Sequence, residues 1–198
     1  MNKTVVKLKV GILGTHGIGK TTLAYELAQV LQKQGTSVSV LTELARECPY
    51  ELGVKQVKEA TTWLITRQIS RELELQKNSE VLLCDRTSID ALIYTLASGK
   101  NDNKDLCIGR AAYDWLRTYD KLIWIRPNQD LVDDGFRMTD IEYRNNIDAI
   151  FRNELKGQSN MIEVSQDLVM DVDRRYIFID AFLKTILAMK TPLNKTKK

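Results

Sequence analysis

Residues 14–21 carry glycines, a lysine and a threonine at the spacing G-x-x-x-x-G-K-[ST]. Glycines let the backbone curl so that successive N–H groups point inward at phosphate oxygens. Lys20 would bring a positive charge to the β- and γ-phosphates of a nucleotide, and the Thr21 hydroxyl can coordinate Mg²⁺. The pattern therefore predicts a nucleotide-binding loop whose contacts come from Gly14, Gly17, Ile18, Gly19, Lys20, Thr21 and Thr22.

Two acidic residues follow segments that have the composition of buried strands. Asp85 comes directly after the apolar run 80–84, where an acid can contact Mg²⁺ or its water shell, and Arg86 next to it can reach phosphate. Glu43 follows the run 37–41 and would face a phosphate acceptor, either to take a hydroxyl proton or to hold the acceptor. Which of Glu43 and Asp85 acts as the base is open, and a salt bridge within a loop is the alternative for Glu43.

Further polar residues near Glu43 are candidates for the acceptor side of the site. Arg46 lies in the same TELARE segment, and Arg67 and Gln68 fall on the next expected helix. We expect Arg46 and Arg67 to bind the acceptor together with Glu43 and Arg86, and Gln68 to form part of the wall. A solvated helix face is the alternative for Arg67 and Gln68. His16 occupies a variable position of the glycine-rich loop, so the pattern assigns it no role.

The charged segment 128–156 contains Arg137 and Arg144, with Arg152 further along the same expected helix. Arginines that close over a transferred phosphoryl group stabilise its spreading negative charge and exclude water. We therefore expect Arg137 and Arg144 to be catalytic residues on a lid. A solvated charged helix is the alternative, and it is favoured for Arg152.

The elements that must position these residues alternate between strands and helices. Apolar and β-branched runs predict strands, and apolar residues at helical spacing predict helices. The expected strands are 5–13, 37–41, 80–84, 122–125 and 161–164, and the expected helices are 20–34, 54–78, 86–98, 108–118, 140–156 and 172–188. In the last helix, one apolar face is expected from Tyr176, Ile179, Leu183 and Ile186. This alternation indicates an α/β fold with a mainly parallel sheet, helices on both faces and ligands at the carboxyl ends of the strands.

Composition limits the class of protein. The chain has 198 residues, 43% hydrophobic and 28% charged, which is typical of one soluble domain. We expect this domain over residues 1–189, with a lid at about 128–156 and a basic, flexible tail at 190–198. The net charge is +3, but four lysines lie in the tail, so residues 1–189 carry −1 and no nucleic-acid surface is expected.

Cysteine usage and hydropathy bear on the compartment. The three cysteines are widely spaced and form no CxxC pair, which favours free thiols in a reducing cytoplasm. No apolar run approaches the roughly 18 residues of a membrane span, so no membrane partner is expected.

Four segments carry a resemblance to a known group of proteins: GTHGIGKTTLAYELA, TELARE, CDRTSIDALIY and DGFRMTDIEYRNNID. They resemble the P-loop kinases of the nucleoside and nucleotide kinase group, most closely the ribosylnicotinamide-kinase-like branch of AAA-type ATP-binding proteins. The resemblance covers most of residues 8–155. It implies a three-layer P-loop NTPase fold whose five parallel strands have the order 2-3-1-4-5, with ATP, Mg²⁺ and a small acceptor as ligands. It also implies that Lys20 and Thr21 bind phosphate and Mg²⁺, that Asp85 lies near the metal, and that Arg137 and Arg144 belong to the lid.

The function predicted from these features is ATP- and Mg²⁺-dependent phosphoryl transfer to a small acceptor such as a nucleoside or nucleotide-like metabolite. The main alternative is a P-loop ATPase or NTP-driven regulator, in which water or a partner replaces the acceptor. A guanine-specific GTPase is disfavoured because no N-K-x-D sequence is present, and residues 103–105 (NKD) fall one residue short. A pure binding module, a homodimer and the identity of the acceptor are left open by the sequence.

Overall fold

The computed structural model describes residues 7–99, 107–128 and 138–190. The strands are β1 (Leu8–Leu13), β2 (Val38–Leu41), β3 (Val81–Asp85), β4 (Lys121–Arg126) and β5 (Met161–Ser165). The helices are α1 (Lys20–Lys33), α2 (Lys58–Gln76), α3 (Ser88–Ala97), α4 (Cys107–Leu116), α5 (Met138–Glu154), α6 (Gln166–Met170) and α7 (Val172–Lys190). Within these three ranges, no helix combines the length and apolar character that crossing a membrane requires.

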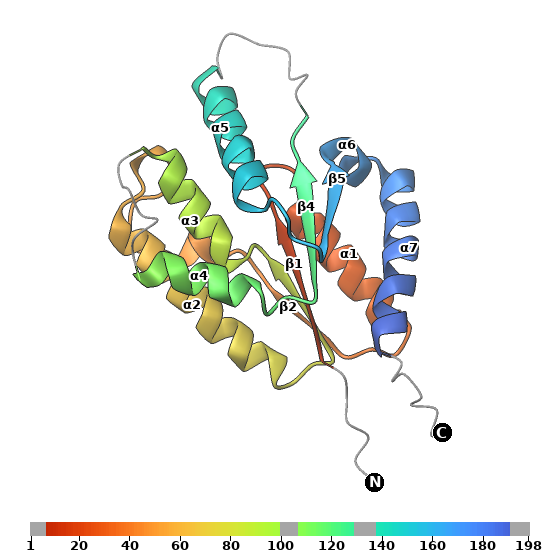
Figure 1. The fold of residues 1–198 in the computed structure, drawn as a ribbon. Helices are drawn as coiled ribbons and strands as arrows, with labels where there is room; N and C mark the ends of the chain where they lie inside the picture. The colour runs from red at the N-terminus through yellow and green to blue at the C-terminus, as the bar shows by residue number, and fades with distance from the viewer. Residues whose placement is uncertain (1–6, 100–106, 129–137, 191–198) are drawn as a thin grey trace.

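The five strands form one sheet in the order β2-β3-β1-β4-β5, and each neighbouring pair is parallel. In the centre of the sheet, Gly11 of β1 is in register with Cys84 of β3 on one side and with Leu122 of β4 on the other. The sheet order implied by the resemblance is therefore confirmed. Because all strands run in the same direction, their carboxyl ends and the loops that follow lie at one edge of the sheet (Figure 1).

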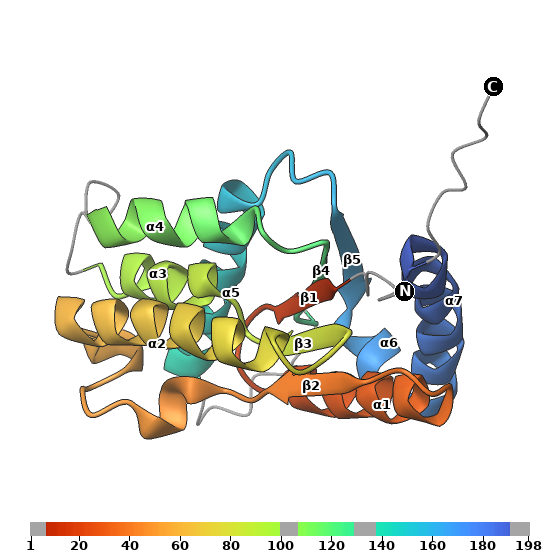
Figure 2. The same cartoon turned by 90° about the horizontal axis from the view of Figure 1, so that it is seen from below.

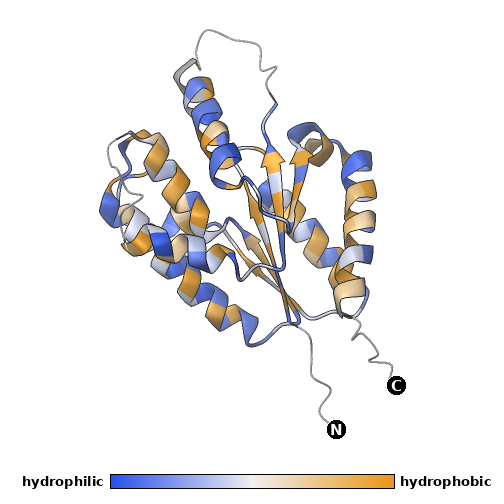
Figure 3. Ribbon diagram, in the orientation of Figure 1, coloured by the Kyte–Doolittle hydropathy of each residue, from blue (hydrophilic) through white to orange (hydrophobic). Residues whose placement is uncertain are grey.

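Helices cover both faces of the sheet, as the alternating pattern predicts. Val10 and Ile12 of β1 pack with α1 and α7 on one face. Leu82 of β3 and Trp124 of β4 point to the opposite face, where they pack with α2, α3, α4 and α5. Figure 2 shows the two groups of helices on opposite sides of the sheet, and Figure 3 shows that the strands carry mostly hydrophobic residues. Such a three-layer arrangement buries the sheet on both sides.

The structure differs from the predicted elements in three places. The expected helix 54–78 begins only at Lys58, because the chain before it forms two short 3-10 turns, η1 (Leu44–Glu47) and η2 (Gly53–Lys55). The five-residue helix α6 was not predicted. Tyr176 of α7 was expected on the buried face but is 53% exposed. Phe182, which was not expected there, is buried together with Ile179.

Only part of the segment expected to form a lid, residues 128–156, is described by the structure. Residues 129–137, which include Arg137, lie outside the described residues. Ile147, Phe151 and Leu155 are fully buried against the sheet and the neighbouring helices. The C-terminal part of the expected lid therefore belongs to the core of the domain.

Candidate active site

The glycine-rich loop connects β1 to α1 at the carboxyl edge of the sheet. Three of its residues have positive φ angles: Gly14 at 132°, Gly17 at 71° and Gly19 at 88°. A Cβ at Gly14 would lie 2.5 Å from the carbonyl oxygen of Ile125, and one at Gly19 would lie 2.8 Å from Val169. Both conformation and space therefore require glycine at positions 14 and 19.

Lys20 is the first residue of α1, and only 6% of it is exposed. Its Nζ donates hydrogen bonds to the carbonyl oxygen of Gly14 at 3.0 Å and to that of Thr15. Burial lowers the pKa of Lys20 from 10.5 to about 7. The ammonium group is thus folded over the loop, where burial and the Arg86 charge outweigh the attraction of the nearby carboxylates, and a bound anion would stabilise its charged form.

Thr21 and Asp85 meet at the start of α1. The Thr21 hydroxyl donates a hydrogen bond to the Asp85 carboxylate, although the two residues come from different strand–helix junctions. Asp85 is the last residue of β3 and is 2% exposed. A hydroxyl and a carboxylate are hard oxygen ligands of the kind Mg²⁺ takes alongside nucleotide phosphates, so this pair fits the metal that the glycine-rich loop implies.

Glu43 and Arg86 form an ion pair between the ends of β2 and β3. Arg86 Nε lies 2.5 Å from Glu43 Oε1, and Arg86 Nη1 lies 3.6 Å from Asp90 Oδ1. The guanidinium carbon of Arg86 lies 5.1 Å from the centroid of the Tyr94 ring. Burial raises the pKa of Glu43, but the effect of the Arg86 guanidinium in the opposite direction is larger, so the net pKa lies below the ordinary value. Glu43 is therefore ionised at neutral pH and able to accept a proton.

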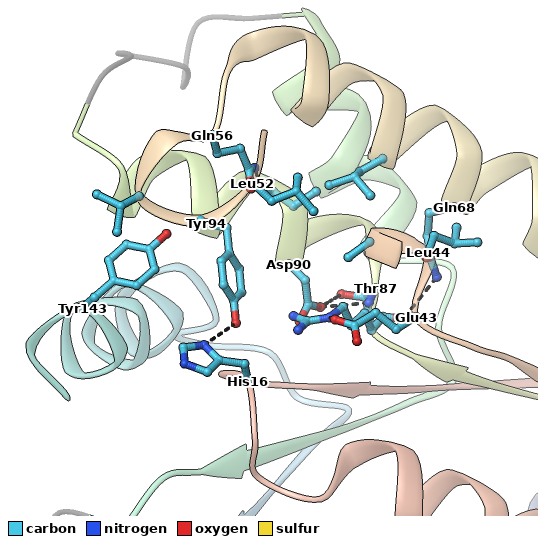
Figure 4. A pocket seen from close by; sticks show the side chains of 16 residues that line it. His16, Glu43, Leu44, Leu52, Gln56, Gln68, Thr87, Asp90, Tyr94 and Tyr143 are labelled. Atoms are coloured by element: carbon cyan, nitrogen blue, oxygen red, sulfur yellow. Dashed lines mark hydrogen bonds and ion pairs between the residues drawn. The ribbon is translucent and has the colours of Figure 1, made fainter. Parts of the chain in front are cut away.

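A cavity of about 360 Å³ opens beside this ion pair. Glu43, Arg86 and Asp90 supply charge at one part of it. Leucines, a valine, two alanines and two tyrosines supply most of the remaining wall (Figure 4). The lining residues are His16, Glu43, Leu44, Ala45, Leu52, Gly53, Val54, Gln56, Leu64, Gln68, Arg86, Thr87, Asp90, Ala91, Tyr94 and Tyr143. We call this cavity the acceptor-side pocket.

The glycine-rich loop contributes directly to the acceptor-side pocket through His16. The Tyr94 hydroxyl lies 3.4 Å from His16 Nδ1, and the Tyr94 ring meets that of Tyr143 edge-on with centroids 6.4 Å apart. Figure 4 shows these three side chains from the loop, α3 and α5 on one side of the pocket. The pocket and the expected phosphate loop are therefore contiguous.

A second cavity of about 640 Å³ lies at the carboxyl ends of β4 and β5. It is lined mainly by polar groups from Arg126, Pro127, Asn128, Glu163, Val164, Ser165 and Asp167. Arg144 is 7% exposed and reaches this region, where its Nη2 donates to the carbonyl oxygen of Asn128 at 2.9 Å. Because β1 lies between β3 and β4, the glycine-rich loop separates this cavity from the acceptor-side pocket.

Two residues expected on the acceptor side do not line the pocket. Arg46 lies on the η1 turn and is exposed. Arg67 lies on α2 with its side chain 41% exposed and pairs with Glu47 at 3.7 Å. Arg67 therefore lies on a solvated helix face, which was the alternative to acceptor binding. Its neighbour Gln68 is buried and does line the pocket.

Asp90, Tyr94 and Tyr143 have no role assigned from the sequence, although Asp90 ends the D-R-x-x-x-D pattern within CDRTSIDALIY. Asp90 Oδ2 accepts hydrogen bonds from the backbone N–H and the hydroxyl of Thr87, both at 2.8 Å, at the start of α3. The Thr-x-x-Asp spacing of a capping box could have located Asp90, and Tyr94 follows four residues later on the same helical face. Tyr143 comes from α5, and no local sequence signal brings that helix to the pocket.

Comparisons with known proteins support the same architecture. A family model described as an AAA domain matches residues 9–175. A search of curated proteins gives no match. Among solved structures, deoxyadenosine kinase from M. mycoides with bound dATP is similar with a TM-score of 0.61 and 22% sequence identity, covering 89% of this chain and 99% of that one. The same kinase with the products dCMP and a flexible dCDP gives a TM-score of 0.59 and 20% identity, covering 90% of this chain and 100% of that one.

Proposed function

The chain belongs to the AAA domain family, and from this premise we propose that it is a kinase that transfers a phosphoryl group from ATP to a hydroxyl of a small, nucleoside-like acceptor. Its fold is that of the P-loop nucleoside and nucleotide kinase group, as the sequence resemblance implied. The observation that carries the proposal is the ionised Glu43, held by Arg86 in a largely apolar pocket next to the glycine-rich loop. An enzyme that only hydrolyses ATP does not need a second pocket of this kind for an acceptor.

The two cavities suit different ligands. The polar cavity beside β4 and β5 suits the ribose and base of ATP, whose phosphates would extend to Lys20 and the N-terminus of α1. The acceptor-side pocket suits a molecule with an apolar or aromatic body and one reactive hydroxyl directed at Glu43. Lys20 lies within electrostatic range of Glu43 and Asp85, which supports a common reaction centre.

In the proposed reaction Glu43 accepts the proton of the acceptor hydroxyl. The acceptor oxygen then forms a bond to the γ-phosphorus of ATP, and the bond from that phosphorus to the bridging oxygen breaks, so that ADP leaves. Lys20 stabilises the negative charge on the transferred group and on the leaving phosphate. Mg²⁺, held through Thr21 and Asp85, would neutralise charge on the phosphates when it is bound.

A nucleoside-like acceptor is proposed because of the pocket's size and walls. About 360 Å³ is at the small end of the range for ligand sites and matches a molecule of one or two rings. Tyr94 and Tyr143 offer aromatic surfaces, and the Gln56 side chain lies in the wall. The nucleoside kinase activity named for the structures of similar fold supports this choice of acceptor class.

The test measures ADP release with ATP and Mg²⁺, first alone and then with each member of a panel of ribo- and deoxyribonucleosides and their monophosphates. The proposal expects at least one acceptor to accelerate ADP release, with one phosphorylated product formed per ADP. Lys20→Met serves as the inactive control, because it removes the ammonium group while preserving side-chain length. Acceptor-independent ADP release across a broad metabolite panel would instead favour an ATPase.

A further inference from the structure

Arg86 has a backbone conformation that side chains rarely adopt. Its φ angle is 89°, and over residues 7–99, 107–128 and 138–190 it is the one non-glycine residue with a positive φ. A side chain in this region is strained, and the conformation persists only where the surrounding structure holds it. Arg86 carries the guanidinium that pairs with Glu43, so whatever holds its backbone also determines where that guanidinium lies.

Hydrogen bonds hold the Arg86 backbone on both sides. Its N–H donates to the carbonyl oxygen of Ile12 in β1 at 2.9 Å. Its carbonyl oxygen accepts from Nε2 of Gln68, on α2, at 3.1 Å. The first bond continues the contact between neighbouring strands, whereas the second depends on a single side chain. In Figure 4 the Gln68 amide points from α2 toward the chain that follows β3.

The Gln68 side chain is itself anchored, through Glu72. Gln68 Nε2 donates a second hydrogen bond to Glu72 Oε1 at 2.8 Å, one turn further along α2. The Glu72 side chain is 0% exposed and also accepts from Lys9 Nζ at 2.8 Å, from Trp115 Nε1 at 2.7 Å and from the Tyr119 hydroxyl. Groups from β1, α4 and the turn before β4 thereby fix the carboxylate, and the carboxylate fixes the amide.

We infer that Gln68 is a positioning residue, which acts on the reaction through Arg86 rather than by touching the acceptor. Both hydrogens of its amide nitrogen are used within the protein, one on Glu72 and one on the Arg86 carbonyl. Loss of these bonds would let Arg86 relax out of the left-handed region and move its guanidinium away from Glu43. The inference rests on the proposed function, because the Arg86–Glu43 pair affects turnover only if an acceptor reacts there.

The kinetic test compares Gln68→Met, which removes the amide at similar volume, with Gln29→Met, the same change at an exposed position of α1. We expect Gln68→Met to lower kcat/KM for the acceptor by about ten- to a hundredfold, as loss of a supporting hydrogen-bond partner does elsewhere. The KM for ATP should stay unchanged, and Gln29→Met should behave as wild type. An equal loss for ATP and acceptor would indicate a general structural defect and would overturn the inference.

A double-mutant cycle separates positioning from direct contact. If Gln68 acts through Arg86, Gln68→Met lowers kcat/KM for the acceptor in the wild-type background but has no further effect in the Arg86→Ala background. If Gln68 touches the acceptor, the same loss appears in both backgrounds, and the inference fails.

A second measurement needs no activity and no change at position 68. Arg86→Gly and Arg86→Ala both remove the guanidinium, but only glycine tolerates a φ of 89° without strain. Glycine also gains more entropy than alanine on unfolding, so at an unstrained position it would be the less stable of the two. The thermal midpoint of Arg86→Gly should therefore equal or exceed that of Arg86→Ala, and a lower midpoint for glycine would show that Arg86 is not held under strain. A higher midpoint for glycine without any phosphorylated acceptor would support the backbone restraint while refuting the kinase.

Discussion

The side chain of Arg86 lies with Nε 2.5 Å from Oε1 of Glu43, and the pair joins the segments that follow β3 and β2. Their side chains are 15% and 26% exposed, so the pair is screened from most solvent yet open to the acceptor-side pocket. The guanidinium keeps Glu43 ionised despite its partial burial. An ionised carboxylate beside the phosphate loop has the charge state needed to accept a proton from an acceptor hydroxyl, and its lowered pKa makes it a weaker base than a free glutamate.

Substitution Glu43→Gln keeps the size of the side chain but removes its ability to take a proton. Loss of a general base costs about 10²- to 10⁴-fold in rate, so acceptor phosphorylation should fall by that amount. Slow hydrolysis of ATP in the absence of acceptor depends on Lys20, Thr21 and Asp85 and should change far less. Measuring product formation and inorganic phosphate release in the same samples separates the two activities.

Glu47→Gln is the matched control, since Glu47 is the last residue of the η1 turn that follows Glu43 and its side chain is 57% exposed. It should leave both activities at the wild-type level. If Glu43→Gln lowers hydrolysis and transfer together, Glu43 acts on water or on the metal. If it changes neither, the Glu43–Arg86 ion pair has only a structural role.

The affinity of the free protein for ATP should depend on the ionisation of Lys20. Burial lowers the pKa of this lysine to about 7, and the phosphates attract its protonated form. Below pH 7 the lysine is charged before ATP arrives, whereas above pH 7 binding must also take up a proton. Binding affinity should therefore fall as the pH rises through 7 toward 9, by up to about tenfold per pH unit.

Isothermal titration calorimetry at several pH values measures this dependence. Lys20→Arg provides the comparison, because a guanidinium stays charged throughout this range. Subtracting its profile removes the contribution of the ionisation of ATP itself. A wild-type profile parallel to that of Lys20→Arg would contradict the assignment of a lowered pKa to Lys20.

The use of Mg²⁺ should depend on Asp85. Asp85→Asn keeps the shape and a hydrogen-bond acceptor for Thr21 but removes the negative charge, so it should raise the Mg²⁺ concentration needed for half-maximal activity by about tenfold or more. The exposed Asp114→Asn on α4 controls for the loss of one charge. Identical Mg²⁺ dependence in Asp85→Asn and wild type, or full activity in the presence of a chelator, would rule out this role.

The buried ion pair between Lys9 and Glu72 should be important for stability. Their side chains are 2% and 0% exposed, with Lys9 Nζ 2.8 Å from Glu72 Oε2. Lys9→Met leaves the carboxylate without its cation and should lower the free energy of unfolding by about 3–5 kcal/mol. Glu74→Gln, at an exposed position of the same helix, should change it by less than about 0.5 kcal/mol. Urea unfolding measures both, and equal stabilities would show that Glu72 is neutral or otherwise compensated.

Much of the fold could be predicted from local sequence patterns. β-branched and apolar runs marked the strands, and their alternation with amphipathic helices was enough to predict a parallel sheet covered on both faces. Lys9 was not predictable as a core residue, because Glu72, which neutralises it, lies 63 residues away in sequence. Helical spacing also could not decide between Tyr176 and Phe182 on α7, since burial there depends on how α7 packs against the sheet.

The candidate site divides in the same way. The glycine-rich loop is a local motif, and Glu43, Asp85 and Arg86 were located because they follow strands whose ends must meet at one edge. No comparable local rule gives the direction of the side chains on the η1 turn and on α2. The sequence therefore could not predict that Gln68 lines the pocket while Arg46 and Arg67 do not. The contribution of Tyr143 depends on the packing of α5, which only the assembled fold determines.

The transfer of the γ-phosphoryl group to a small molecule is tested most directly with ATP labelled at the γ-phosphate. The protein is incubated with labelled ATP, Mg²⁺ and the acceptor panel, and the label is followed into organic products and inorganic phosphate by separation and mass analysis. The proposed kinase places the label on an acceptor in wild type and loses that product in Glu43→Gln. Label found only in inorganic phosphate, at a rate that no acceptor changes, would contradict phosphoryl transfer to a small molecule.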